Sequence, residues 1–381
     1  MLNRKKIPYG NHFINNDDIN AVSRTLRNEK ITTGQEVTKF ELKIKKYLNC
    51  KYSLVCNSGT SAIFMAMYSI GLKKNDNIIM PSINFIASYN VARIFGANIY
   101  LADVDKFTGQ MTPQDLENCR KKFSIKKIKA VILMYNGGYP QNADKFLAFK
   151  KKFNCFIIED ACHAFGASYK YRNKYIKVGS CKHSDISTFS LHPLKTITTG
   201  EGGIVSTNNK KIYEKLKSFR TLGIKRSIKH WEYNIYDLGF NFRLTDFQCS
   251  LGISQLKKIN LFIDRRKKIF DAYSFKLKKI PQIKCPNFLK GYKSSYHLYL
   301  INIKDFNKKK KDQLIKYMLK NKVILQYHYI PIYKFKLFKD KYIGKNSEIY
   351  YNSTLSLPIY VGLKQRQINL IVNLLKKFFN H

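Results

Sequence analysis

The chain has 381 residues, of which 44% are hydrophobic, so it can bury a large core and a fully disordered protein is excluded. Lysine and arginine number 69 against 25 acidic residues, giving a formal charge of +44 that would suit nucleic acid or an acidic membrane face. The lysines are spread over the whole length, however, with 308–311 as the only run of four. This distribution favours a general bias towards AT-rich codons over a dedicated polyanion site.

The cysteines and the N-terminus bear on where the protein resides. The eight cysteines form no Cys-x-x-Cys pair and have no clustered histidines, so we expect neither a metal site nor a disulfide framework. Residues 1–8 lack an apolar signal core, and no segment approaches the roughly 20 apolar residues of a membrane span. The sequence therefore predicts a cytoplasmic protein with reduced thiols and no membrane span.

Hydrophobic residues recur at helical spacing at 19–26 and at 40–48, which predicts two amphipathic helices on either side of a loop at 29–34. From about residue 50, short apolar runs alternate with longer periodic ones. Strands are predicted at 52–56, 78–80, 130–134, 155–159, 186–190 and 203–207, and helices at 61–72, 85–95 and 143–153. This alternation is typical of an α/β fold with a mainly parallel sheet.

The C-terminal part follows Thr245, which with Asp246 makes a reasonable helix cap. Helical periodicity then runs to about residue 278, strands are predicted at 296–303 and 323–327, and helices at 310–319 and 365–379. We predict a helical arm over residues 1–48, a large cofactor-binding domain over 49–245, and linker helices with a small α+β domain over 246–381.

Lys195 is flanked by sequence that is not typical of a surface lysine. An apolar strand precedes it, and a turn-rich segment with glycines at 200, 202 and 203 follows it. A constrained loop of this kind can hold lysine in a pocket, where lost hydration lowers its pKa and frees a neutral amine to attack a carbonyl. The pattern is typical of a Schiff-base lysine; in so lysine-rich a chain, a solvated side chain is the alternative.

Residues 56–62 join a predicted strand to a predicted helix. Gly59 permits the close approach of a ligand to the backbone there. The hydroxyls of Thr60 and Ser61 and the amide groups of the helix N-terminus would point at a ligand bound against them. The segment is a candidate phosphate cradle, and a simple helix cap is the alternative.

Four further residues follow or precede elements at positions suited to a ligand. Asp160 ends an apolar strand, where α/β folds bind ligands, and a carboxylate there can keep a pyridine nitrogen protonated. Phe85 could stack on a planar ring, and Asn241 stands just ahead of a helix. For Asp160 the alternative is a surface acid or a cap, and for Asn241 it is a cap. For Phe85 the alternative is a place in the core, and for His163 a purely structural role.

These features occur together in one α/β chain, and the combination points to pyridoxal phosphate. Its phosphate would lie in the cradle at residues 60–61, its pyridinium against Asp160, its ring face on Phe85 and its aldehyde on Lys195. Ser190, five residues before Lys195, is placed to add a hydroxyl to the phosphate.

The sequence resembles the DegT/DnrJ/StrS family of nucleotide-sugar aminotransferases over nearly its whole length. The segments that carry the resemblance are Pro8-Tyr9-Gly10, Ile31-Thr32-Thr33-Gly34, Phe40-Glu41, Ser58-Gly59-Thr60-Ser61-Ala62, Glu159-Asp160-Ala161-Cys162-His163-Ala164-Phe165-Gly166, the Lys195 segment, Asn241-Phe242-Arg243-Leu244-Thr245-Asp246 and Leu357-Pro358-Ile359-Tyr360. The resemblance implies a fold-type I aminotransferase with a mixed, mainly parallel sheet flanked by helices and a smaller C-terminal α+β domain. It also implies a homodimer, in which Asn241 reaches the cofactor phosphate of the neighbouring subunit.

Some relatives replace the lysine by histidine and dehydrate their substrate instead, and Lys195 argues against that reaction here. One departure from the family pattern is the segment 136–140, Asn-Gly-Gly-Tyr-Pro, which is glycine-rich where relatives usually have a less flexible stretch.

Within the family, the sequence is particularly similar to the aminotransferases of pseudaminic acid biosynthesis, at residues 82–85, 236–243, 251–257 and 326–333. The resemblance implies transfer of an amino group from glutamate, which leaves as 2-oxoglutarate, to C4 of a UDP-4-keto-6-deoxy-N-acetylhexosamine. It implies contacts with this substrate for Tyr9, Lys30, Ile31, Thr32, Tyr327, His328, Tyr329 and Ile330.

Two other interpretations remain open from the sequence. A basic nucleic-acid-binding protein is suggested by the charge and by 26 Tyr and 26 Phe, although such aromatics should be interleaved with basic residues on an exposed platform. A family member that binds the cofactor and only senses a sugar, without turnover, is the other.

Overall fold

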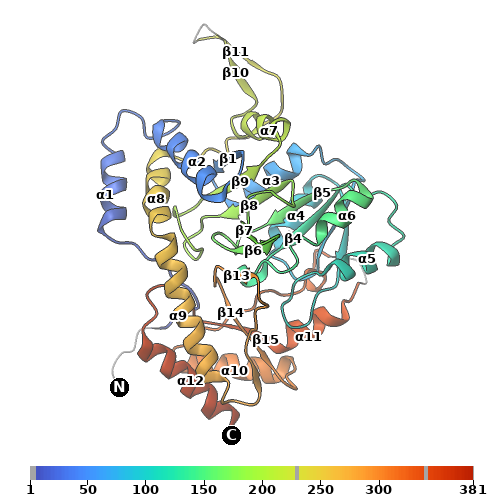
Figure 1. The fold of residues 1–381 in the computed structure, drawn as a ribbon, viewed down its shortest axis with the longest axis vertical. Helices are drawn as coiled ribbons and strands as arrows, with labels where there is room; N and C mark the ends of the chain where they lie inside the picture. The colour runs from blue at the N-terminus through green and yellow to red at the C-terminus, as the bar shows by residue number, and fades with distance from the viewer. Residues whose placement is uncertain (1–5, 228–230, 339–341, 381) are drawn as a thin grey trace.

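A mixed sheet of seven strands forms the centre of the larger part of the computed structural model, which describes residues 6–227, 231–338 and 342–380 (Figure 1). Its strands, in spatial order, are β1 (Tyr52–Cys56), β9 (Gly203–Thr207), β8 (Ile186–Ser190), β5 (Phe156–Asp160), β4 (Ala130–Met134), β2 (Asn77–Pro81) and β3 (Asn98–Ala102). Within this sheet β9 runs against both of its neighbours, and the pairs from β8 through to β3 are parallel. The predicted α/β class with a mixed, mainly parallel sheet is confirmed.

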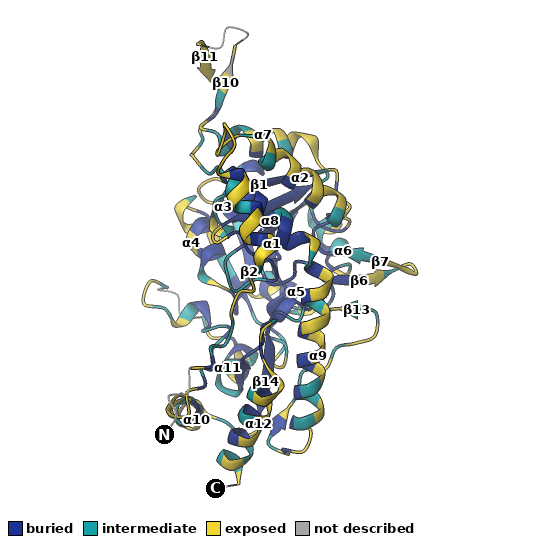
Figure 2. Ribbon diagram, turned by 90° about the vertical axis from the view of Figure 1, so that its left-hand side faces the viewer, coloured by how far each residue is buried: buried dark blue, intermediate teal, exposed yellow. Residues whose placement is uncertain are grey.

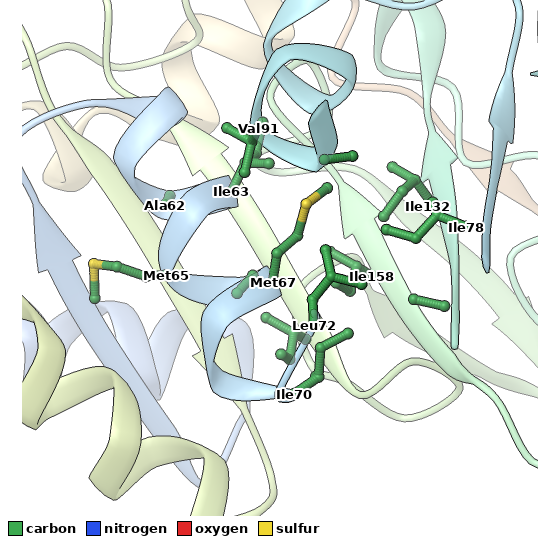
Figure 3. Packing of buried hydrophobic residues seen from close by; sticks show 14 of the residues in the cluster. Ala62, Ile63, Met65, Met67, Ile70, Leu72, Ile78, Val91, Ile132 and Ile158 are labelled. Atoms are coloured by element: carbon green, nitrogen blue, oxygen red, sulfur yellow. The ribbon is translucent and has the colours of Figure 1, made fainter. Parts of the chain in front are cut away.

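Helices cover both faces of this sheet, and its strands are therefore buried on both sides. The helices α3 (Gly59–Ser69), α4 (Ile86–Ile94) and α7 (Lys210–Arg220) share one core with side chains such as Ile132 and Ile158. Figure 3 shows Met67 of α3 packed towards these strands. The alternate side chains, such as Val131 and Ile157, face α5 (Pro113–Lys122) and α6 (Phe146–Phe153).

The N-terminal helices α1 (Asn16–Thr25) and α2 (Gln35–Leu48) pack against α8 (Asp246–Lys257). Their position is fixed by polar groups as well as by packing: Asp18 of α1 is buried and pairs with Lys258 at 2.7 Å, and Asp246 accepts hydrogen bonds from the backbone amides of Gly34 and Glu36. The predicted long helix after Thr245 is two helices, because the chain leaves helical geometry at Lys258 before α9 (Ile259–Leu277) begins.

The helix α9 leads to a smaller part with its own core, seen at the bottom of Figure 1. This part contains the sheet β12 (Ile283–Lys284), β14 (Tyr299–Ile303) and β15 (Thr354–Leu357), with α10 (Lys308–Lys320), α11 (Lys345–Ser353) and α12 (Gln365–Phe379). The strand predicted at 323–327 is wrong: Val323 and Gln326 form only isolated bridges, to Ile7 and Ser356, so no continuous partner strand supports it. The division of the chain at residues 48 and 245 stays a prediction.

Smaller elements lie at the edges of these two parts. They are β6 (Ser168–Tyr171), β7 (Lys174–Lys177) and β13 (Tyr292–Lys293), the turns η1 (Asn136–Gly138) and η2 (Ile332–Lys334), and the hairpin β10 (Ile224–Arg226) and β11 (Tyr233–Ile235). The hairpin extends away from the body of the molecule (Figures 1 and 2).

Burial follows the layers, with dark strands at the centre and exposed outer faces on the helices (Figure 2). Tyr and Phe side chains supply most of the largest fully buried side chains. This placement removes much of the aromatic support for a nucleic-acid platform. Among the described residues, no helix has the length and apolar character needed to cross a membrane.

Candidate active site

A cavity of about 530 Å³ opens where the carboxyl ends of β1, β2, β5 and β8 face the smaller part of the chain. Ligands of α/β proteins bind at this edge of the sheet. Predicted site residues that line the cavity are Tyr9, Gly59, Thr60, Phe85, Asp160, His163, Ser190, Lys195, Tyr327, His328, Tyr329 and Ile330. Folding thus brings together residues from both halves of the sequence.

Lys195 lies on the cavity wall in a turn whose backbone amide donates to the carbonyl of His192 at 2.9 Å. Burial lowers the pKa of the Lys195 ammonium, and the acidic groups of Cys162 and Asp160 only partly oppose that shift. A lowered pKa increases the fraction of neutral amine at physiological pH, which is the form that attacks a carbonyl or takes a proton.

Asp160 ends β5 with only 2% of its side chain exposed. Its Oδ2 accepts a hydrogen bond from the Ser88 hydroxyl at 3.0 Å, and its Oδ1 accepts a long one from the Cys162 amide at 3.4 Å. Within the described residues, no lysine or arginine forms an ion pair with it. A buried carboxylate of this kind suits a cationic N–H group of a ligand.

The start of α3 forms a narrow cradle beside the end of β8. A Cβ added at Gly59 would lie 2.9 Å from the Cβ of Ser190, so only glycine lets the two segments approach this closely. The capping residue is Ser58, whose Oγ accepts from the Ser61 amide at 3.0 Å. The Ser61 hydroxyl donates to Asn57 Oδ1 at 2.6 Å and does not line the cavity, since the N-terminal turn of the helix uses it internally.

Aromatic groups form another part of the wall. The Phe85 side chain is 52% exposed, and its ring centroid lies 5.7 Å from that of Tyr329. The buried His163 ring lies 4.2 Å from that of His297, and its Nε2 lies 2.7 Å from the Tyr329 hydroxyl. Burial lowers the pKa of His163 well below its usual range, and the nearby Lys195 lowers it further.

Besides Ser61, four predicted residues lie outside the cavity of their own chain. Lys30 lines a separate groove of about 1060 Å³ along α1, α2 and α8. The neighbouring Ile31 carbonyl accepts from the Asp246 amide at 2.9 Å and Thr32 bridges Thr245, so pairing with the start of α8 holds this loop away from the cavity. Asn241 bridges Thr221 and also does not line the cavity.

Several lining residues were not predicted from the sequence. His297, Gln326 and Phe335 come from the smaller part of the chain, and Asn84 and His192 from the larger part. His297 precedes a strand with no motif around it, so no local signal could have identified it. His192 and Asn84 stand within the Lys195 and Phe85 segments, and their proximity to those residues was the available signal.

The side chains present fit a cofactor with a phosphate, a cationic ring nitrogen and an aldehyde. The absence of a side chain at Gly59 leaves room for a phosphate beside the helix start, Asp160 offers a buried carboxylate that has no ion-pair partner among the described residues, and Lys195 offers an amine. Pyridoxal phosphate needs these three kinds of group.

Comparisons with known proteins agree with this chemistry. Residues 12–376 match the model of the DegT/DnrJ/EryC1/StrS aminotransferase family. The chain is 35% identical over 358 residues to the UDP-4-amino-4,6-dideoxy-N-acetyl-beta-L-altrosamine transaminase of Campylobacter jejuni, covering 93% of this chain and 92% of that protein. It is 29% identical over 349 residues to the GDP-perosamine synthase of Escherichia coli, covering 91% of each.

The fold is also similar to a solved structure, that of Helicobacter pylori PseC, an aminotransferase involved in the biosynthesis of pseudoaminic acid. The TM-score is 0.90 at 29% identity, over 99% of this chain and all of the other.

Proposed function

Because the chain belongs to the DegT/DnrJ/EryC1/StrS aminotransferase family and is a pyridoxal-phosphate-dependent sugar aminotransferase, we propose that it transfers an amino group from glutamate to C4 of a UDP-4-keto-6-deoxy-N-acetylhexosamine. The observation that carries the proposal is the placement of Lys195 in one cavity with Asp160 and the Gly59 cradle. The choice of sugar is supported by the likeness to the transaminase of Campylobacter jejuni.

When bound, the cofactor supplies an aldehyde carbon that carries the amino group between donor and acceptor, and a pyridine ring that accepts electrons. We assign the binding roles to Thr60, Ser190 and Asp160, with Phe85 against the ring face. The Lys195 amine would take the α-proton of glutamate in the first half-reaction and deliver a proton to C4 of the sugar in the second. Its lowered pKa suits both tasks, because a proton shuttle works best with a pKa near the working pH.

The sugar would lie between Tyr9 and the segment 327–330, which line the cavity on the side of the smaller part. For Lys30, Ile31 and Thr32, contact with substrate would require a second copy of the chain, because their loop lies away from the cavity of its own chain.

A homodimer is supported by the arm around β10 and β11. Ile235, Tyr236 and Leu238 expose 64%, 73% and 79% of their side chains, an unusual display of apolar surface on one extension. Docking on a second copy would cover these side chains. Asn241, which follows the arm, would then approach the cofactor phosphate of the neighbouring subunit.

Purified protein with added cofactor tests the assignment of Lys195. We expect a yellow wild type and a Lys195→Ala variant without the visible absorption band, while Lys182→Ala, which removes an exposed lysine, keeps the band. Glutamate-dependent release of 2-oxoglutarate is then measured with UDP-, GDP- and dTDP-4-ketosugars. A colourless wild type would refute the assignment, and turnover confined to GDP- or dTDP-sugars would refute the proposed substrate.

A further inference from the structure

A chain of three hydrogen-bonding groups runs through the wall of the cavity. The Gly137 backbone amide donates to His163 Nδ1 at 3.4 Å, and His163 Nε2 lies 2.7 Å from the Tyr329 hydroxyl. A backbone amide can only donate, so Nδ1 must be the acceptor nitrogen of the ring. In a neutral imidazole the proton then resides on Nε2 and is donated to the Tyr329 oxygen.

These donor and acceptor assignments determine which hydrogen bond the Tyr329 hydroxyl can still make. Its oxygen accepts from His163, so its own O–H proton remains for another acceptor. The Tyr329 side chain lines the cavity beside Phe85. The proton therefore becomes available to a bound group.

The assignment requires His163 to be neutral, and its surroundings keep it so. The ring is buried, and burial lowers its pKa well below the usual range. The charged and titratable groups that face it are Lys195, His297 and His328, and any positive charge on them lowers the pKa further. Burial and the nearby Asp160 raise the pKa of Tyr329 well above its usual range, so Tyr329 stays a donor.

The turn Asn136–Gly138 determines where the Gly137 amide points. Gly137 and Gly138 have φ of 71° and 85°, a region that favours glycine. A side chain at Gly138 would overlap the Ser295 hydroxyl and lie 2.5 Å from the His163 carbonyl. Close packing between this turn, His163 and the smaller part thus requires glycine at 138, whereas at Gly137 it is the positive φ that favours glycine.

The same turn also holds the segment that bears Tyr329. Asn136 Nδ2 donates to the His328 carbonyl at 3.2 Å and to the Tyr350 hydroxyl at 2.7 Å, and Tyr350 in turn donates to the His328 carbonyl at 2.6 Å. The His297 amide donates to the Gly137 carbonyl at 3.1 Å. One short turn therefore fixes the ring of His163 and the backbone next to Tyr329, which gives the glycine-rich departure at 136–140 a role.

We propose that the turn Asn136–Gly138 and His163 are positioning residues that commit the Tyr329 hydroxyl to donate a hydrogen bond to an oxygen of the group bound in the cavity. The acceptor is a phenolate or carbonyl oxygen, carried either by the cofactor ring or by the 4-ketosugar. The inference rests on the proposed function for the identity of these groups, whereas the donor and acceptor roles of Gly137, His163 and Tyr329 follow from the protein alone.

The direction of the chain is tested by nuclear magnetic resonance of the holoenzyme with 15N-labelled histidine, using His163→Gln to assign the signal. We expect His163 to carry its proton on Nε2 from pH 6 to pH 8. A proton on Nδ1, or titration of the ring within this range, would overturn the proposal. This result does not depend on which sugar the enzyme uses, so it separates a failure here from a failure of the proposed substrate.

The role of the hydroxyl is tested with Tyr329→Phe, and with Tyr273→Phe as a control that removes a buried hydroxyl donating to the Pro358 carbonyl. Loss of a hydrogen bond to a charged or polarised oxygen should weaken the affected step by about 10- to 100-fold. If the acceptor is on the cofactor, the pH titration of the visible band shifts without sugar present. If it is on the sugar, the band and the glutamate half-reaction stay as in the wild type and only the sugar half-reaction slows. A Tyr329→Phe enzyme that matches the control in all three measurements would refute the proposal.

Discussion

The close approach of Gly59 to Ser190 predicts how a single methyl group should impair cofactor binding. In Gly59→Ala, the new Cβ would lie 2.9 Å from the Ser190 Cβ and 3.3 Å from both its Cα and its Oγ. The first distance is shorter than side chains tolerate, and two of these atoms are fixed by the backbone of β8. The start of α3 and the end of β8 must therefore move apart.

The cost can be estimated from the two opposing effects of the substitution. Overpacking of this kind destabilises a protein by about 1–3 kcal/mol. Alanine in a helix gains up to about 1 kcal/mol over glycine. We expect the free energy of unfolding of the apoprotein to fall by about 0–3 kcal/mol. Displacement of the cradle should also cost one hydrogen bond to the phosphate, which corresponds to roughly 10- to 100-fold weaker cofactor binding.

Two measurements check this prediction. Urea unfolding of the apoprotein gives the stability, and titration of the visible band with pyridoxal phosphate gives the dissociation constant. Gly362→Ala is the matched control, because its Cβ would meet nothing closer than 3.9 Å and its backbone is compatible with alanine. Gly59→Ala protein that binds the cofactor as tightly as the control would show that this segment is not the phosphate cradle.

Two further predictions concern a buried lysine and the exposed arm. Lys311 is fully buried between the rings of Tyr327 and Tyr351, and burial lowers its pKa to about 7. In the unfolded chain Lys311 keeps its usual pKa near 10.5 and stays protonated up to about pH 10, whereas in the folded chain it loses its proton above about pH 7. Because the unfolded chain binds more protons between pH 7 and pH 10, the free energy of unfolding should rise over this range. Lys311→Met should remove this rise and stabilise the protein at pH 6.5 by about 1–4 kcal/mol. Urea unfolding measures both effects, and a variant whose stability depends on pH as that of the wild type does would contradict the reasoning. Leu238→Asp should convert the proposed homodimer to monomer in light scattering, while Leu261→Asp, a control at another exposed leucine, should not. A dimeric Leu238→Asp protein would exclude the arm as the interface.

The sequence determined the elements and residues whose signals are local. Strands at the centre of the sheet are short apolar runs, and their ends mark the ligand edge of an α/β fold, so Asp160, Ser190 and Gly59 could be placed before the structure was known. Lys195 could be recognised because a strand and a glycine-rich turn enclose it. Elements with weak periodicity, such as β3 and α5, were not predicted.

Tertiary structure alone decided which of these residues meet. It held Lys30 in the groove along α1, α2 and α8, away from the cavity. It also brought His297 against His163 and placed the Asn136–Gly138 turn against His163 and the backbone next to Tyr329. The contacts of His163 with His297 and of Asn136 with His328 join residues more than a hundred positions apart. Their energies depend on packing and hydrogen-bond geometry that no local pattern records. The sequence therefore identified the chemistry of the site, and the fold determined the orientation of the groups that perform it.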